Sequence, residues 1–175
     1  MKVVIISASP RKNGNTHLAM NYVFEYVKSK NVDVNLLNLS EEKIECYRGP
    51  EEEYNDVTKN AANDVMDADV WLIGSPIYNS FFSSALKNLF EYVNYKKTEG
   101  KVAGIVIMAA GNIGFVDVQT MITQLLSYYR VITNPKALFL TVDSVSENSL
   151  TDESAKERLR EMVDGTLKIA FRMKG

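Results

Sequence analysis

The side chains in this sequence with the clearest capacity for chemistry are concentrated between residues 7 and 16. That segment reads Ser-Ala-Ser-Pro-Arg-Lys-Asn-Gly-Asn-Thr, and it contains serine hydroxyls, two adjacent cations, two amides and a closing threonine. These groups donate hydrogen bonds or carry positive charge, and the free N–H groups at the start of a following helix would add to them. The segment therefore predicts a binding site for a phosphate group.

The spacing of glycine in this loop excludes two common kinds of phosphate site. Gly14 is the only glycine between residues 7 and 16. A dinucleotide fingerprint needs G-x-G-x-x-G, and an NTPase loop needs G-x-x-x-x-G-K-[ST]. Hydrogen-bond donors must therefore come from side chains as well as from the backbone, which favours a phosphate monoester held end-on over a pyrophosphate. We expect Thr16 to cap the helix that follows.

The rest of the chain offers no set of residues for nucleophilic or metal catalysis. Cys46 is the only cysteine and His17 the only histidine. An intrachain disulfide and a multi-cysteine metal site are excluded, and no catalytic triad can be argued from spacing. We assign no role to His17. We expect the binding residues to be the functional ones, with no catalytic side chain and no metal.

Length and composition are those of a globular protein with a substantial core. The 175 residues are 46% hydrophobic and 24% charged, with a formal net charge of -2. This charge is too slight to indicate a nucleic acid or an acidic membrane as a partner. The apolar run before Ser7 is only four residues long, too short for a signal-peptide core or a membrane span. We expect one cytoplasmic domain, residues 1–175.

Short apolar runs alternate with segments of helical spacing along the chain. Alternation of this kind predicts an α/β protein with a parallel sheet between two layers of helices. Right-handed crossovers favour a five-stranded sheet of order 2-1-3-4-5, which binds ligands where the first and third strands end. The expected strands are residues 3–7, 32–39, 69–75, 102–110 and 137–142, and the expected helices centre on 19–27, 57–65, 82–93, 122–129 and 151–170.

A second unusual loop follows the third expected strand and reads Gly-Ser-Pro-Ile-Tyr-Asn-Ser over residues 74–80. Pro76 stiffens its backbone, while Tyr78 offers a ring and Asn79 an amide. Because the first and third strands are neighbours in the expected order, this loop and the phosphate loop would line one crevice. A flat heteroaromatic ligand would fit there.

A third loop follows the fourth expected strand and reads Ala-Ala-Gly-Asn-Ile-Gly-Phe over residues 109–115. Gly111 and Gly114 allow a ligand to approach the backbone closely, and Asn112 can donate or accept a hydrogen bond. We expect this loop to complete the crevice.

Together, these loops resemble those of the NADPH-dependent FMN reductase family, which has the flavodoxin-like fold, a three-layer α/β/α sandwich. The likeness rests on Ser-Pro-Arg at 9–11, Asn-Gly-Asn-Thr at 13–16, Ser-Pro-Ile-Tyr-Asn at 75–79 and Ala-Leu-Lys-Asn at 85–88, and it extends over most of the chain. The resemblance implies a phosphate-binding role for Ser9, Arg11, Asn13, Asn15 and Thr16, contact with the flavin rings for Pro76, Ile77, Tyr78 and Asn79, and contact with the pyrimidine edge for Ala110, Gly111, Asn112 and Gly114.

The resemblance also implies an activity. NADPH or NADH would give a hydride from nicotinamide C4 to N5 of bound FMN, and the electrons would pass to a second, small-molecule acceptor such as a flavin or quinone. The aromatics Phe81, Phe82, Tyr92 and Tyr95 around the third expected helix, taken with the oligomeric flavin reductases that the chain resembles, suggest a homodimer or homotetramer.

Three other functions can be weighed against this activity. Related iron-sulfur flavoproteins carry a compact cysteine cluster before the second helix, but residues 45–51 hold a single thiol where four are needed. A receiver-type signalling domain needs carboxylates where this chain has serines and a proline. A flavodoxin-like FMN electron-transfer protein without direct NAD(P)H oxidation stays open, because flavin binding alone does not establish that reaction.

Overall fold

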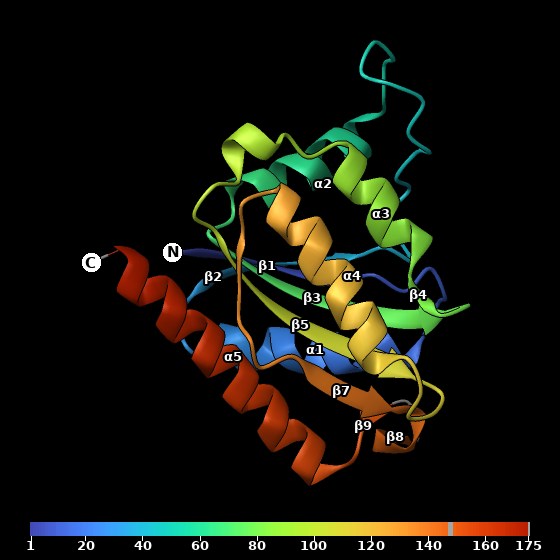
Figure 1. The fold of residues 1–175 in the computed structure, drawn as a ribbon, viewed down its shortest axis with the longest axis vertical. Helices are drawn as coiled ribbons and strands as arrows, with labels where there is room; N and C mark the ends of the chain where they lie inside the picture. The colour runs from blue at the N-terminus through green and yellow to red at the C-terminus, as the bar shows by residue number, and fades with distance from the viewer. Residues whose placement is uncertain (147–148, 175) are drawn as a thin grey trace.

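A parallel sheet lies between two layers of helices, as Figure 1 shows for this computed structural model, which describes residues 1–146 and 149–174. Its strands run in the order β2-β1-β3-β5, and β6 and β7 both pair with β5 on its outer side. The predicted α/β sandwich and the order of its five strand positions are therefore confirmed. The strands are β1 (Lys2–Ser7), β2 (Asp33–Asn38), β3 (Val70–Tyr78), β5 (Val102–Ala109), β6 (Ile132–Thr133) and β7 (Leu138–Thr141).

The fifth strand position is divided between β6 and β7 because a proline interrupts it. Pro135 has no N–H group to offer the ladder, and Asn134 turns its side chain to the backbone N–H of Lys136, which lies 3.0 Å from Asn134 Oδ1. Only the second half of this position was predicted from the apolar pattern.

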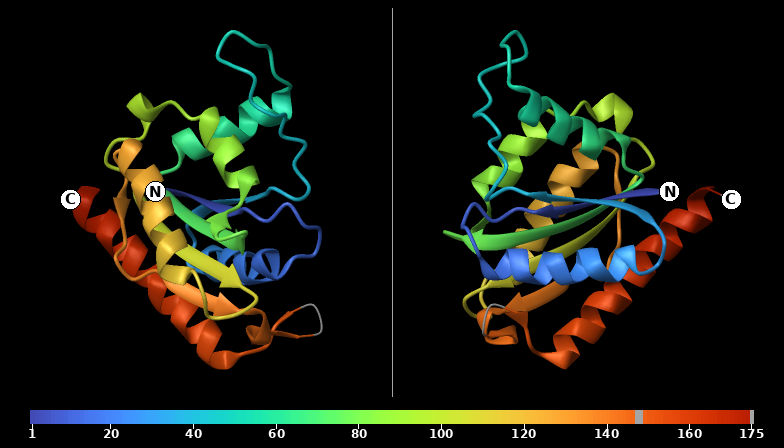
Figure 2. Two further views of the ribbon diagram at one scale, coloured as in Figure 1. Left: turned by 45° about the vertical axis from the view of Figure 1, so that its right-hand side comes forward. Right: turned by 180° about the vertical axis from the view of Figure 1, so that it is seen from behind.

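Helices α1 and α5 cover one face of the sheet, and α2, α3 and α4 cover the other (Figure 2). In β1, Val3 and Ile5 face α1 and α5, while Val4 and Ile6 face the other layer, and all four are fully buried. Burial on both faces explains why the strands are continuous apolar runs. The helices are α1 (Asn15–Lys28), α2 (Asp56–Asp67), α3 (Ser84–Glu91), α4 (Phe115–Tyr128) and α5 (Glu153–Lys174).

Two details of the helix starts differ from the expectation. Helix α1 begins at Asn15 with Gly14 as its N-cap, so Thr16 lies buried in the first turn and the prediction that it caps the helix was wrong. Phe82 belongs to a short strand, β4 (Phe81–Phe82), that pairs antiparallel with β3, and α3 starts only after Ser83. In both places a turn fixed by contacts outside the helix decides where the helix begins.

The remaining short elements are two 3₁₀ turns, η1 (Tyr95–Lys97) and η2 (Val142–Ser144), and the antiparallel pair β8 (Val145–Ser146) and β9 (Ser149–Leu150). No helix among the described residues has both the length and the apolar composition needed to cross a membrane.

Between β2 and α2 the chain makes a long excursion that tyrosines hold together (Figure 1). The Tyr92 hydroxyl donates to the carbonyl of Glu45 at 2.7 Å, and its ring meets those of Tyr47 and Tyr54 edge-on. Burial of this hydroxyl raises the pKa of Tyr92 to about 12. The hydroxyl and the ring of Tyr92 thus both make contacts within the same chain.

The position of α1 depends on Gly74 in β3. A Cβ atom at this residue would lie 2.3 Å from Cγ and 2.4 Å from Sδ of the fully buried Met20. Only a residue without a side chain lets α1 pack this closely on the sheet.

We expect Gly74→Ala to lower the free energy of unfolding by about 1 to 3 kcal/mol, because the added methyl group overpacks the core beneath α1. Urea unfolding of the apoprotein measures the change. Gly111→Ala is the matched control, because its Cβ would meet no atom within 4 Å, and an equal loss of stability in both variants would contradict the packing argument.

Candidate functional site

A pocket of about 1060 Å³ opens at the carboxyl edge of the sheet. All the residues predicted for binding in the first two loops line it, and so does Ala110. Gly111, Asn112 and Gly114 are not part of its wall. The lining residues are Ser9, Arg11, Lys12, Asn13, Gly14, Asn15, Thr16, Pro76, Ile77, Tyr78, Asn79, Ser84, Met108, Ala109, Ala110 and Val142.

The phosphate loop, residues 8–16, folds back on itself around the buried side chain of Ser9. Ser9 Oγ accepts a hydrogen bond from the backbone N–H of Arg11 at 3.2 Å and lies 3.3 Å from the Tyr78 hydroxyl. The N–H of Gly14 then donates to the carbonyl of Arg11 at 3.3 Å. This turn brings the loop directly onto the start of α1.

Gly14 has little space for a side chain at this turn. A Cβ there would lie 3.0 Å from Ser9 Oγ and 3.2 Å from the carbonyl oxygen of Arg11. Helix α1 begins at the next residue. The N–H groups of His17 and Leu18 donate to the carbonyl of Gly14, whereas those of Asn15 and Thr16 come too early in the helix to have a carbonyl acceptor within it. The pocket wall thus includes the positive end of a helix dipole, which favours an anion.

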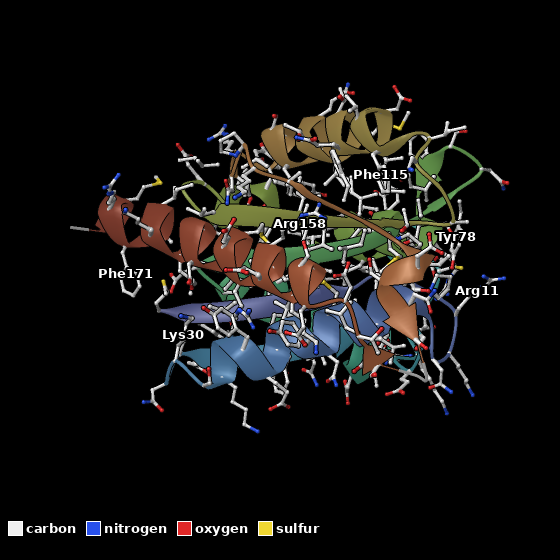
Figure 3. All side chains as sticks on the ribbon, turned by 90° about the horizontal axis from the view of Figure 1, so that it is seen from below. Arg11, Lys30, Tyr78, Phe115, Arg158 and Phe171 are labelled. Atoms are coloured by element: carbon white, nitrogen blue, oxygen red, sulfur yellow. The ribbon has the colours of Figure 1, made fainter. Side chains whose placement is uncertain are left out.

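Two cations stand beside this helix start. The Arg11 guanidinium lies 5.9 Å from the centre of the Tyr78 ring, and both labelled side chains lie at the same edge of the molecule in Figure 3. Arg11 and Lys12 are exposed, and neither forms an ion pair in the part of the chain that the structure describes. No Asp or Glu is among the pocket-lining residues. The site fits a phosphate group.

Hydrogen bonds through Ser83 fix the first two loops relative to each other. The Ser83 hydroxyl donates to the carbonyl of Ala8 and accepts from the N–H of Leu86 at 3.1 Å, which makes it the N-cap of α3. The Ser83 N–H donates to Ser75 Oγ at 3.2 Å, and the N–H of Ala8 donates to the carbonyl of Gly74 at 2.8 Å. The two loops therefore form one rigid wall.

Asn79 has a backbone role in addition to its predicted contact with a ligand. Tyr78 pairs with Phe81 across the β3–β4 hairpin, which leaves Asn79 and Ser80 as the two residues of the turn. Their φ angles are 48° and 63°, the left-handed pair of a type I′ turn. Asparagine tolerates this conformation better than most residues do.

The third loop lies beside the pocket. Gly114 caps α4 with a φ of 85°, and a Cβ there would come within 3.7 Å of Ile77 Cδ1. Ile113 is 90% exposed. The roles of Gly111, Asn112 and Gly114 in binding therefore stay predictions.

Several wall residues were not predicted from the sequence. Lys12 and Gly14 belong to a loop already predicted to bind phosphate, so their place in that loop could have identified them as wall residues. Met108 and Ala109 end β5, and Val142 follows β7. Proximity to the carboxyl end of a strand could have identified them. Ser84, at the start of α3, enters the wall only through the β3–β4 hairpin.

Comparisons with known proteins agree with this geometry. Residues 1–146 match the sequence model of the family described as NADPH-dependent FMN reductase. The chain is 28% identical over 133 residues to the NAD(P)H-dependent FAD/FMN reductase of Geobacillus thermodenitrificans, covering 75% of this chain and 72% of that protein. It is 26% identical over 164 residues to the NADPH azoreductase of a Bacillus species, covering 93% and 89%.

A solved structure shares the whole fold. The flavoenzyme NAD(P)H:(acceptor) oxidoreductase from Paracoccus denitrificans superposes with a TM-score of 0.79 at 19% identity, and the match covers 98% of each chain. This likeness confirms the expected flavodoxin-like fold.

The β3–β4 turn gives a direct test of what Asn79 contributes. We expect Asn79→Val to lower stability by about 1 to 3 kcal/mol, because a β-branched residue is strained at positive φ. The matched variant Asn79→Gly keeps the turn, and its stability should stay within about 1 kcal/mol of the original. Thermal unfolding measures both. A Gly variant as unstable as the Val variant would show that the turn conformation is not the cause.

Proposed function

Because this chain belongs to the family of NADPH-dependent FMN reductases, we propose that the pocket at the carboxyl edge of its sheet is the FMN site. The protein is an NAD(P)H-dependent FMN oxidoreductase. The assignment of the pocket rests on the phosphate loop. Two exposed cations and the start of α1 lie together there, and no carboxylate lines the pocket.

The phosphate of FMN would lie against this loop. A phosphate monoester carries a charge between about -1.5 and -2 at neutral pH, so it matches Arg11 and the positive end of α1 together. Ser9, Asn15 and Thr16 add side-chain hydrogen-bonding groups, and Asn13 lies beside them. In this proposal the hydroxyl of Tyr78, already close to Ser9 Oγ, links the phosphate loop to the wall for the rings.

The wall proposed for the flavin rings consists of Pro76, Ile77, Tyr78 and Asn79, and Ala110 also lines the pocket. When bound, FMN supplies the N5 atom that accepts a hydride from the nicotinamide and passes electrons to a second acceptor. The side chains around it position the two reactants and exclude water, and they supply fixed dipoles instead of a nucleophile. Neither a catalytic side chain nor a metal has a part in this proposal.

The acceptor, assembly and location of the protein belong to the same proposal. The acceptor is a small molecule, such as a flavin, a quinone or, as the name of the Bacillus relative suggests, an azo compound. The chain acts as one domain, residues 1–175, in a cytoplasmic homodimer or homotetramer, with no nucleic-acid or membrane partner. Phe81 and Val116, 48% and 66% exposed, are apolar surface that a second copy could cover.

Arg11 tests the phosphate site. We expect Arg11→Ala to weaken FMN binding about ten- to a hundredfold, because a charge-assisted hydrogen bond contributes about 1.5 to 3 kcal/mol. Quenching of flavin fluorescence on titration measures the dissociation constant. Lys59→Ala, which removes an exposed cation from α2, is the matched control. Equal FMN affinity in the Arg11 variant and the unaltered protein would remove Arg11 from the site.

The choice between a reductase and an electron carrier is made by one spectroscopic experiment. The protein is loaded with FMN, freed of excess flavin and mixed anaerobically with NADPH or NADH. We expect the visible flavin absorbance to bleach within the mixing time of a manual experiment with at least one nucleotide. Retained absorbance that neither nucleotide bleaches would favour the electron-transfer alternative.

A further inference from the structure

Three polar side-chain atoms are buried without a hydrogen-bond partner among the described residues: Ser7 Oγ, His17 Nδ1 and Asn38 Nδ2. Ser7 is fully buried and Asn38 is 6% exposed. A buried polar group without a partner costs about 1 to 3 kcal/mol, so groups of this kind are normally satisfied by a water molecule or ligand. Their location relative to one another therefore matters.

Ser7 and Asn38 are neighbours on one face of the sheet. They are the last residues of β1 and β2 and pair directly in the parallel ladder. Side chains alternate between the two faces of a strand, so Ser7 faces the same way as Val3 and Ile5, which pack beneath α1 and α5. Asn38 shares this face with Leu36. Ser7 Oγ and Asn38 Nδ2, the two atoms without a partner, thus lie under α1.

His17 lies in the first turn of α1, above the ends of these strands. Tyr26, on the same helix, donates to Asp164 of α5 at 2.9 Å and so marks the side that faces α5. His17 precedes Tyr26 by nine residues, or two and a half helical turns of about 3.6 residues each, so it lies on the opposite side of α1. That side faces β2. The right-hand view of Figure 2 shows α1 and α5 side by side, with β2 beyond α1.

We propose that one buried water molecule joins His17 Nδ1, Asn38 Nδ2 and Ser7 Oγ, and that His17 is a positioning residue for the phosphate loop. The donors and acceptors are complementary. Asn38 Oδ1 already accepts from the N–H and hydroxyl of Ser40 at 3.3 and 3.0 Å, so its Nδ2 group remains to donate to the water. The water then donates to Nδ1 of the imidazole and has Ser7 Oγ as its third partner. Three hydrogen bonds are typical of a buried water.

The positions of Ser7 and His17 along the chain give this link its function. They flank the phosphate loop, residues 8–16, on its two sides, and Asn38 belongs to a different strand. A water held by all three fastens both ends of the loop to the sheet before any ligand arrives. A loop ordered in advance loses less entropy on binding phosphate. This inference rests on the proposed role of the loop in FMN binding.

A pair of substitutions of nearly equal shape separates the hydrogen bond from packing. His17→Asn places its Oδ1 acceptor where Nδ1 stands, whereas His17→Leu places a methyl group there. We expect the Leu variant to bind FMN about tenfold more weakly, because a loop that is no longer held by the water loses more entropy when it binds phosphate, and the Asn variant to remain within about twofold of the unaltered protein. Ser7→Ala should fall between them. Fluorescence titration gives the affinities, and thermal unfolding of each variant shows that it folds.

Equal FMN affinities in the Leu and Asn variants, whether both unchanged or both weakened, would overturn the role of His17. A high-resolution crystal structure of the unaltered protein is the second test, and density for a water within about 3 Å of all three atoms is the expected result. Its absence would overturn the link itself. Failure of the unaltered protein to bind FMN would instead refute the proposed function, and the crystal structure would still decide the water.

Discussion

The hydrogen bond from the Ser83 hydroxyl to the carbonyl of Ala8 joins the two parts of the chain on which the pocket depends. Ala8 is the first residue beyond β1, and Ser83 follows the β3–β4 hairpin. The same hydroxyl caps α3, and the Ser83 N–H donates to Ser75 Oγ in the buried part of β3. One residue, Ser83, therefore sets the spacing of the phosphate loop, the hairpin wall and a helix, and none of the three can move without breaking a buried hydrogen bond.

Local charge at the site differs from the charge of the chain as a whole. The protein has a formal net charge of -2, yet the pocket is lined by Arg11 and Lys12 and by no carboxylate. The field that an anionic ligand meets is set by these nearby groups and by the α1 dipole, because more distant exposed charges are screened. Net charge alone gives no indication of a phosphate site here, whereas the order of residues in one loop does.

Much of the fold was predictable because its signals are local in sequence. Long apolar runs such as Val70 to Ile73 can be satisfied only in a sheet buried on both faces, and the order of strands follows from their alternation with helices. The two-residue strands β4 and β6 were not predictable in this way, since pairing with a neighbour, rather than their own pattern, makes them strands. The cap of α1 was misassigned for a similar reason: the turn between Arg11 and Gly14 starts the helix before Thr16.

The residues of the site were likewise predictable where their signal is local in sequence, and were missed where it depends on tertiary structure. The first two loops each carry their chemistry within ten residues, so most of the wall they form was predicted from the sequence, with Lys12 and Gly14 as the exceptions within the first loop. Val142 lines the pocket only because β7 ends beside β5. No short sequence motif indicates this pairing. A pocket of about 1060 Å³ is slightly larger than the roughly 300 to 1,000 Å³ typical of ligand sites. Under the proposed function, that size matters because FMN must receive electrons from a reductant and pass them to an acceptor, so both must reach the pocket.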